Sequence, residues 1–221
     1  MLQLNPSARF QVLSTVTEIF NQFTPKYNRT FNRHGWAYDW IVKVLPIWQR
    51  WVCSVIPYIV GPNVLEISCE NGYLISSYAN QYKTYGITSN WEAVCKSRKN
   101  LREFGAHAQI QHADSAVLPF AKDTFSTVIN TMAFSCRPNQ EQTMAEVRRV
   151  LKPHGRFLLV EMGYPGIHKK LGMQVYQLWG VGDDIVGNTQ VLFKQFGFDY
   201  HHQIVGGFGS VHLFVGIKKS G

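Results

Sequence analysis

The stretch NVLEISCENGYLISSYANQYKTYGIT, residues 63–88, decides the fold. Its apolar run at 63–68 predicts a buried strand, 72–82 predicts a helix, and 84–88 predicts a second buried strand. A strand, a helix and a strand in this order form a βαβ unit, in which the two strands run parallel and the crossover is right-handed. The sequence therefore predicts an α/β protein built on a parallel sheet.

The same alternation continues through the rest of the chain. The pattern predicts, in order, a helix at 90–105, strands at 108–114 and 125–133, a helix at 139–155, a strand at 156–163, a helix at 189–198 and a two-stranded hairpin at 199–219. We expect a doubly wound sheet, mostly parallel, with helices on both faces and an antiparallel C-terminal hairpin. Such a sheet binds ligands beyond the carboxyl ends of its strands.

The composition is that of a globular protein. Of the 221 residues, 45% are hydrophobic and only 16% are charged, which is enough apolar material for a sizeable core. Residues 9–60 have a helical pattern and no long linker follows them. We therefore expect an N-terminal helical lid or extension at 1–60, followed by one sheet-containing unit at 61–221.

The formal net charge of +8 permits an anionic partner but does not choose one. The lysines and arginines are dispersed, whereas a nucleic-acid binder gathers them in a stripe, so we expect no nucleic acid. Trp40, Trp48 and Trp51 could contact a membrane surface peripherally, together with Lys43 and Arg50. A helix packed on the sheet is the more frequent explanation of such a segment.

We expect no membrane-spanning helix, no signal peptide and no structural metal. Residues 40–60 contain charges and two prolines, which a spanning helix lacks. The first ten residues lack the basic, apolar and small-residue succession of a signal peptide. The four cysteines are scattered, and the adjacent Asp183 and Asp184 are typical of a turn. A cytoplasmic monomer or homodimer is the expectation, with peripheral membrane contact as the alternative.

Polar residues stand at the predicted carboxyl ends of the first three strands. In the first loop, Gly72 ends what would be a series of three glycines, while Ser68 and Glu70 stand at the other two places. Glycine matters there because a ligand approaches the backbone and some positions need φ > 0. The second strand ends at Thr88, near the distance at which nucleotide-binding folds contact a ribose. Asp114 follows the third strand and could accept a hydrogen bond from adenine.

Four blocks of the sequence carry recognisable motifs: VLEISCENGYL (64–74), GITSN (86–90), HADSAVLPFAKDTFSTVI (112–129) and EVRRVLKPHGRFLLVEMG (146–163). Together they resemble the class I S-adenosylmethionine (SAM)-dependent methyltransferases. The last two blocks, the lead-in FNQFTPKYNRTF (20–31) and the C-terminal segment 192–219 are similar to the branch of the ubiquinone/menaquinone C-methyltransferases and their type 11 relatives. The resemblance implies a Rossmann-like fold and SAM as cofactor, with S-adenosylhomocysteine as product and no metal. It also implies methyl transfer to a small aromatic or lipid-like acceptor.

The resemblance also implies which residues contact the cofactor. They are Tyr27, Glu66, Ser68, Cys69, Gly72, Thr88, Ser89, Asp114, Ser115, Asn130, Thr131 and Met132. Within this set, the loop after the first strand would face the methionine part of SAM. The residues that end the second strand would face the ribose, and those that end the third would face the adenine. Those that end the fourth would line the methyl-transfer mouth, and Tyr27 would close over the cofactor.

The catalytic base is the least defined part of the predicted site. Methyl transfer needs a base only if the acceptor must lose a proton. His34, His168, His201 and His202 are the candidates. His34 is favoured because it lies in an aromatic connector that should fold over the mouth, and His168 because it follows the fifth strand.

Two other functions stay open. The loss of two motif glycines favours a protein of the same fold that no longer transfers methyl groups, either a cofactor-binding partner subunit or an enzyme with other chemistry. The third function is that of a nucleic-acid methyltransferase, which the net charge suggests. Against it, the fourth strand runs into NTMAFS (130–135), where enzymes that methylate amino groups of DNA carry an [DN]-P-P-[YFW] motif.

Overall fold

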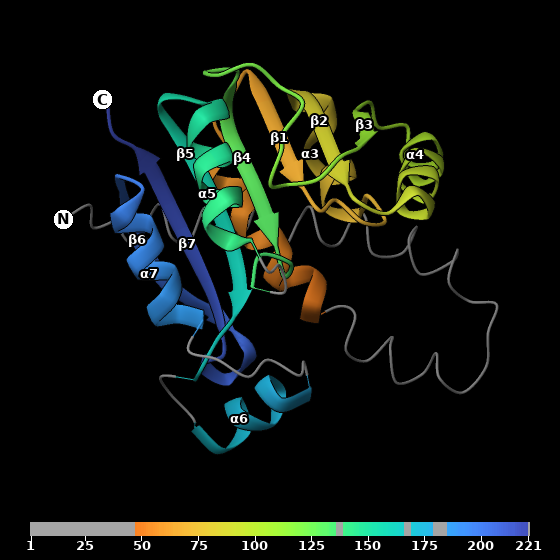
Figure 1. Cartoon of the computed structure of the whole chain (residues 1–221). Helices are drawn as coiled ribbons and strands as arrows, with labels where there is room; N and C mark the ends of the chain where they lie inside the picture. The colour runs from red at the N-terminus through yellow and green to blue at the C-terminus, as the bar shows by residue number, and fades with distance from the viewer. Residues whose placement is uncertain (1–46, 136–138, 166–168, 179–184, 221) are drawn as a thin grey trace, which may run out of the picture.

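The computed structural model describes residues 47–135, 139–165, 169–178 and 185–220 (Figure 1). Tyr27, His34 and His168 of the predicted site lie outside these residues, as does most of the predicted lid. The described residues form a seven-stranded sheet with the order β3-β2-β1-β4-β5-β7-β6. Its strands are β1 (Asn63–Ile67), β2 (Lys83–Thr88), β3 (Gln109–His112), β4 (Phe125–Thr131), β5 (Leu151–Met162), β6 (Phe198–Gly206) and β7 (Val211–Lys218).

The strand directions confirm the predicted architecture. β1 pairs in parallel with β2 and β4, β2 pairs in parallel with β3, and β4 pairs in parallel with β5. β7 inserts between β5 and β6 and is antiparallel to both. The sheet is therefore mostly parallel and closes with an antiparallel hairpin, as the sequence predicts.

Helices cover both faces of the sheet (Figure 1). The described helical elements are η1 (Cys53–Tyr58), α3 (Tyr73–Tyr78), η2 (Ala79–Gln81), α4 (Trp91–Phe104), α5 (Gln140–Val150), α6 (Lys169–Leu178), α7 (Ile185–Gln195) and η3 (Gly207–Gly209). On β5, Leu158 and Val160 pack in a core with η1, α3 and α4, whereas Phe157 and Leu159 pack in a second core with α5 and α7. Because successive side chains of a strand point to opposite faces of the sheet, β5 contributes to two separate cores.

Two predicted helices end earlier than the sequence pattern suggests. The helix expected at 139–155 ends at Val150, and Leu151 already has extended backbone (φ −72°, ψ 136°) and belongs to β5. The physical reason is Pro153, which has no N–H for a helix and forces the residue before it out of the helical region. The helix expected at 72–82 ends at Tyr78 and tightens into the 3₁₀ turn η2.

Helix boundaries on the C-terminal side of the sheet also differ from the expectation. α7 begins at Ile185, four residues before the helix expected at 189–198. α6 lies in a segment to which the sequence pattern assigned no element, and it packs against the η3 turn beyond the end of β5 (Figure 1).

The described end of the predicted lid packs directly on the sheet. Residues 47–52 are helical and η1 follows them. Trp51 is buried in the core with η1, while Arg156 Nη1 donates to Tyr58 O at 2.9 Å. Val60 N donates to Thr127 Oγ1 at 2.9 Å, and the same hydroxyl donates back to Val60 O at 2.7 Å. This part of the tryptophan-containing segment is therefore a packed layer of the domain.

No helix in the described ranges combines the length and the apolar character that crossing a bilayer requires.

The antiparallel hairpin is held to α7 by a stack of aromatic rings. The ring of Phe193 lies 5.6 Å from Phe157 and 5.7 Å from Phe214, nearly parallel to each. It fits because β7 has Gly216 beneath it: a Cβ at that position would lie 2.3 Å from Phe193 Cε1. Phe193 is fully buried, so the ring has no open space into which it could move.

We therefore predict that Gly216→Ala lowers the free energy of unfolding by about 1–3 kcal/mol, the usual cost of adding a methyl group to a filled core. Urea denaturation checks this. If the clash with Phe193 is the cause, Gly216→Ala combined with Phe193→Leu should cost clearly less than the sum of the two single changes. Additive costs would show that another contact is responsible.

Candidate functional site

The loop between β1 and α3 keeps the backbone of a glycine-rich turn, although two of its glycines are missing. Ser68 has φ 59°, Glu70 has φ 37° and Gly72 has φ 73°, all in the left-handed region. For Ser68 and Glu70 this conformation costs about 1–2 kcal/mol per residue, because the Cβ crowds the following carbonyl. The sequence lost the residue type that favours this turn, but the turn itself is retained.

Contacts from β2 and α4 hold the loop in this shape. Cys69 N donates to Ile87 O at 3.0 Å, and a Cβ on Gly86 would lie 3.0 Å from the Cys69 sulfur. Ser97 Oγ donates to the carbonyl oxygen of Glu70. Gly72 is equally confined, since a Cβ there would lie 3.2 Å from Ser97 Cα. Strand and helix therefore determine the loop, which explains how it accommodates unfavourable φ values.

Glu66 and Cys69 of the predicted cofactor set have their side chains inside the core. Tyr78 Oη donates to Glu66 Oε2 at 2.7 Å, and both side chains are buried. Burial raises the pKa of Glu66 to about 8, and the hydrogen bond from Tyr78 opposes part of that shift. Burial likewise raises the pKa of the Cys69 thiol. Only their backbones can contribute to the surface of the loop.

The carboxyl ends of β2 and β3 bring the next predicted residues together. Thr88 is buried, and its hydroxyl donates to Glu70 Oε1 at 3.5 Å and accepts from Asn90 N at 3.3 Å. His112 Nε2 donates to the carbonyl oxygen of the exposed Ser89 at 3.0 Å, which ties the two strand ends to each other. The predicted ribose-contacting residues therefore border the first loop.

The two residues predicted to contact adenine differ in accessibility. Asp114 is exposed, and its Oδ1 accepts a hydrogen bond from Ala116 N at 2.9 Å. Ser115 is buried, and its hydroxyl shares a hydrogen bond with Thr143 Oγ1 of α5 at 3.2 Å. Asp114 is thus open to a ligand, whereas the Ser115 side chain fastens the loop to α5.

The end of β4 contributes a buried polar atom that has no hydrogen-bond partner among the described residues. Asn130 is 1% exposed, and its Oδ1 accepts no hydrogen bond within the described ranges. Such an acceptor is costly unless a ligand or water satisfies it. Thr131 and Met132 are half-buried beyond it, and Met132 takes a left-handed φ of 57°. The unpaired oxygen and the loop of left-handed residues fit a polar ligand at this edge.

Trp91 and Glu161 belong to this edge of the sheet and were not among the predicted site residues. Trp91 opens α4 directly after β2, is 61% exposed, and lies with its ring edge-on to His112 at 6.1 Å between centroids. Its position next to a strand end could have singled it out. Glu161 is buried on β5 and accepts from Phe134 N at 2.6 Å and from Ser135 Oγ at 2.7 Å. Nothing local in the sequence marks that pairing.

The two described histidines that were candidate bases lie on the outermost strand, β6. His201 is exposed. His202 shares a hydrogen bond with His212 Nδ1 at 2.8 Å, and its ring stacks on Phe214 at 4.5 Å. Burial lowers the pKa of His202, and the charge of His201 lowers it further. These contacts give His202 a packing role in the hairpin.

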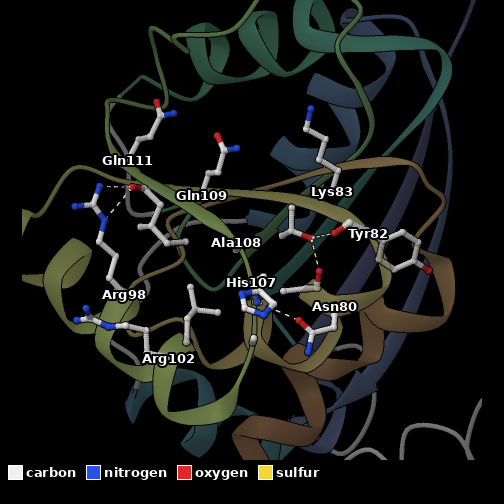
Figure 2. A pocket seen from close by; sticks show the side chains of 14 residues that line it. Asn80, Tyr82, Lys83, Arg98, Arg102, His107, Ala108, Gln109 and Gln111 are labelled. Atoms are coloured by element: carbon white, nitrogen blue, oxygen red, sulfur yellow. Dashed lines mark hydrogen bonds between the residues drawn. The ribbon is translucent and has the colours of Figure 1, made fainter.

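A hollow of about 970 Å³ lies elsewhere on the described surface (Figure 2). The amino-terminal ends of β2 and β3 and the last turns of α4 line it. Lys83, Arg98 and Arg102 surround it without an acidic residue among its lining side chains, and Arg98 is fastened to Ile110 O at 2.7 Å. None of the predicted site residues that the structure describes lines it, and those that follow β1, β2, β3 and β4 stand at the opposite ends of these strands.

Comparison with known proteins agrees with this arrangement. A family model described as a methyltransferase domain matches residues 64–155. The chain is 27% identical over 139 residues to the ubiquinone/menaquinone biosynthesis C-methyltransferase UbiE of Blochmanniella pennsylvanica, a match that covers 60% of this chain and 54% of that protein. The chain thus spans about half the length of this curated relative.

Solved structures share the fold at low sequence identity. A SAM-dependent methyltransferase from Methanosarcina mazei superposes with a TM-score of 0.62 and 18% identity, covering 76% of this chain and 97% of that one. The [4+2]-cyclase SpnF superposes with a TM-score of 0.63 and 15% identity, covering 73% of this chain and 76% of that one. The predicted fold is confirmed, and so is the resemblance to the class I SAM-dependent methyltransferases and their ubiquinone/menaquinone branch.

The buried carboxyl of Glu66 predicts a pH-dependent stability. The unfolded chain loses this proton near its ordinary pKa of 4.5, whereas the folded protein retains it up to about 8. Its contribution to stability is therefore complete below pH 4.5 and is lost as the pH rises to about 8. At about 1.4 kcal/mol per pKa unit, the loss is on the order of 3–5 kcal/mol.

The Glu66→Gln variant has no titrating group at this position. Its free energy of unfolding should therefore rise relative to that of the wild type as the pH increases from 5 to 8. Urea denaturation of both proteins at a series of pH values measures the difference. A difference that stays constant over this window would mean that Glu66 is ionised in the fold at neutral pH.

The role of Glu161 gives a second prediction. Glu161→Ala removes the acceptor of the N–H groups of Phe134 and Ser135, and should cost about 2–4 kcal/mol of unfolding free energy. Glu103→Ala is the control, because its pair with Lys99 is exposed at 3.9 Å and should contribute under about 1 kcal/mol. If both variants lose the same free energy of unfolding in urea denaturation, Glu161 does not anchor this loop.

Proposed function

We propose that this protein is a methyltransferase that binds SAM at the carboxyl ends of β1, β2 and β4 and methylates a small acceptor. The observation that carries the proposal is the loop from Ser68 to Gly72, which keeps three left-handed positions although only Gly72 favours that conformation. Backbone strain persists where the surrounding structure over-determines it, and such places gather at functional sites. The methyltransferase-domain match over residues 64–155 supports the same proposal.

Different residues around the loop would contact different parts of the cofactor. The backbone of the loop would face the methionine part of the cofactor, and the strand end at Thr88 and Ser89 would face the ribose. Asp114 is exposed and free to accept from an exocyclic amine, and the exposed indole of Trp91 offers a face on which adenine could stack. Asn130 Oδ1 offers a buried acceptor on the methyl-transfer side.

Bound SAM supplies an activated methyl group, so the main task of the chain is to position the reactants. Its residues must hold the cofactor and the acceptor in line and keep water out. The backbone of Phe134 and Ser135, fixed by the buried Glu161, forms a firm wall next to the end of β4. A base is required only where the acceptor loses a proton, and the favoured candidates, His34 and His168, lie outside the described residues.

We propose a small aromatic or lipid-like acceptor. Support comes from the relative in Blochmanniella pennsylvanica, which is named for methylation at carbon in ubiquinone and menaquinone biosynthesis. A cytoplasmic protein with peripheral access to a membrane surface would suit such an acceptor.

A second candidate is a protein of this fold that no longer transfers methyl groups. One observation favours it: Glu70 places a carboxylate at a glycine position of the cofactor loop. The fold accommodates other chemistry, because the [4+2]-cyclase SpnF has it too.

Calorimetric titration with SAM and with S-adenosylhomocysteine tests the proposal. We expect micromolar dissociation constants, followed by release of S-adenosylhomocysteine when quinols or phenols are offered with SAM. Trp91→Ala should weaken binding by about tenfold, a typical effect of losing one base-stacking face. Val191→Ala on α7 is the control, since Val191 is equally exposed at 61% and belongs to a different part of the surface.

No binding at millimolar ligand would reject the proposal. Binding without transfer to any acceptor would favour the second candidate.

A further inference from the structure

Glu70 is the residue of the site whose type differs most from the glycine expected in a glycine-rich loop. It occupies the second of the three places, with a left-handed φ of 37° and an exposed side chain. A glycine there would be free of backbone strain and would leave more room for a ligand. A bulky acid at such a place therefore needs an explanation beyond the fold of the loop.

The Glu70 side chain reaches the carboxyl end of β2. Its Oε1 accepts from Thr88 Oγ1 at 3.5 Å, while the same hydroxyl accepts from Asn90 N at 3.3 Å. The bond from Asn90 uses the hydroxyl as an acceptor, which leaves its proton available to Glu70. The carboxylate thus stands beside the strand end where α/β nucleotide-binding folds use an acid to contact a ribose.

The backbone beneath this carboxylate is fixed by α4. Ser97 Oγ donates to the carbonyl oxygen of Glu70, and Asn100 Nδ2 donates to that of Asn71 at 2.8 Å. The Glu70 side chain therefore starts from a determined position next to Thr88.

Among the residues that the structure describes, the carboxylate of Glu70 has no cationic partner. Within the described ranges, the ion pairs join Lys99 to Glu103, Arg149 to Glu146, Lys218 to Asp123 and Lys219 to Asp199, and none involves Glu70. A carboxylate can accept from two neighbouring hydroxyls, whereas Thr88 has a single hydroxyl to offer. The first loop thus contains the group that the end of β2 lacks.

We infer that Glu70 takes the place of the missing strand-end acid and accepts hydrogen bonds from the two ribose hydroxyls of the cofactor. This inference rests on the proposed function and adds a specificity-determining residue to it. The acid has moved from the end of β2 to the neighbouring loop, and Thr88 orients it.

Binding of S-adenosylhomocysteine to the purified full-length wild type and four variants tests the inference by calorimetry. Relative to the wild type, Glu70→Gln and Glu70→Gly should each bind about tenfold more weakly or worse, because hydrogen bonds to a charged acceptor are lost. Glu70→Gly combined with Thr88→Asp returns an acid to the strand end and should recover most of the affinity. Glu103→Gln, an exposed acid of α4, should leave binding unchanged.

A ligand without the two hydroxyls separates recognition of the ribose from a general effect of charge. The 2′,3′-dideoxy analogue of S-adenosylhomocysteine should bind the wild type about tenfold more weakly than the parent ligand. It should bind Glu70→Gln nearly as well as the parent does. Equal losses in both proteins would overturn the inference.

The outcomes also separate this inference from the proposed function. If Glu70→Gly binds S-adenosylhomocysteine as tightly as the wild type, or more tightly, the carboxylate does not contribute to binding or hinders it. The inference then fails while the proposed function stands. If the wild type binds no S-adenosylhomocysteine, both fail. Thermal melts of each variant exclude misfolding, and removal of a strained residue should not lower the melting temperature.

Discussion

The packing of the β1–α3 loop against strand β2 is the contact on which the rest of the site depends. Cys69 N donates to Ile87 O, and the Cys69 side chain, together with Ile110 and Ile75, fills the space that Gly86 leaves by having no Cβ. Ser68 and Glu70, on either side of Cys69, both have left-handed φ. This strained backbone is held between β2 and α4, and the Glu70 side chain reaches Thr88 at the end of β2.

Buried carboxyl groups stabilise the two halves of this edge in different ways. Glu66 lies under the first loop beside Tyr78, and burial favours its neutral form. Glu161 lies under the loop after β4, where backbone N–H groups and Ser135 compensate for its burial, although its pKa is still raised. Both acids support the surface from below, whereas Glu70 and Asp114 are exposed on it. The buried acids and the exposed acids of this edge are therefore separate sets.

One group of basic side chains within the described residues lies away from this edge. The hollow bordered by Lys83, Arg98 and Arg102 lies at the amino-terminal ends of β2 and β3, away from the loop. Among the described residues, three of the six non-glycine residues with left-handed φ, Ser68, Glu70 and Met132, follow the carboxyl ends of β1 and β4. The other three, Asp123, His154 and Phe208, lie elsewhere in the fold.

The sequence by itself determined the βαβ order, the antiparallel end of the sheet and the positions of Thr88, Asp114 and Asn130 at strand ends, because these follow from local periodicity and from parallel pairing. It also held the signal for the early end of α5 in Pro153. Only the tertiary structure decided that Ser68 and Glu70 keep a glycine-like turn, that the Glu66 side chain faces Tyr78, and that Glu161 anchors the loop at Ser135. These contacts join residues on different elements, and neither residue type nor spacing encodes which buried polar groups will meet.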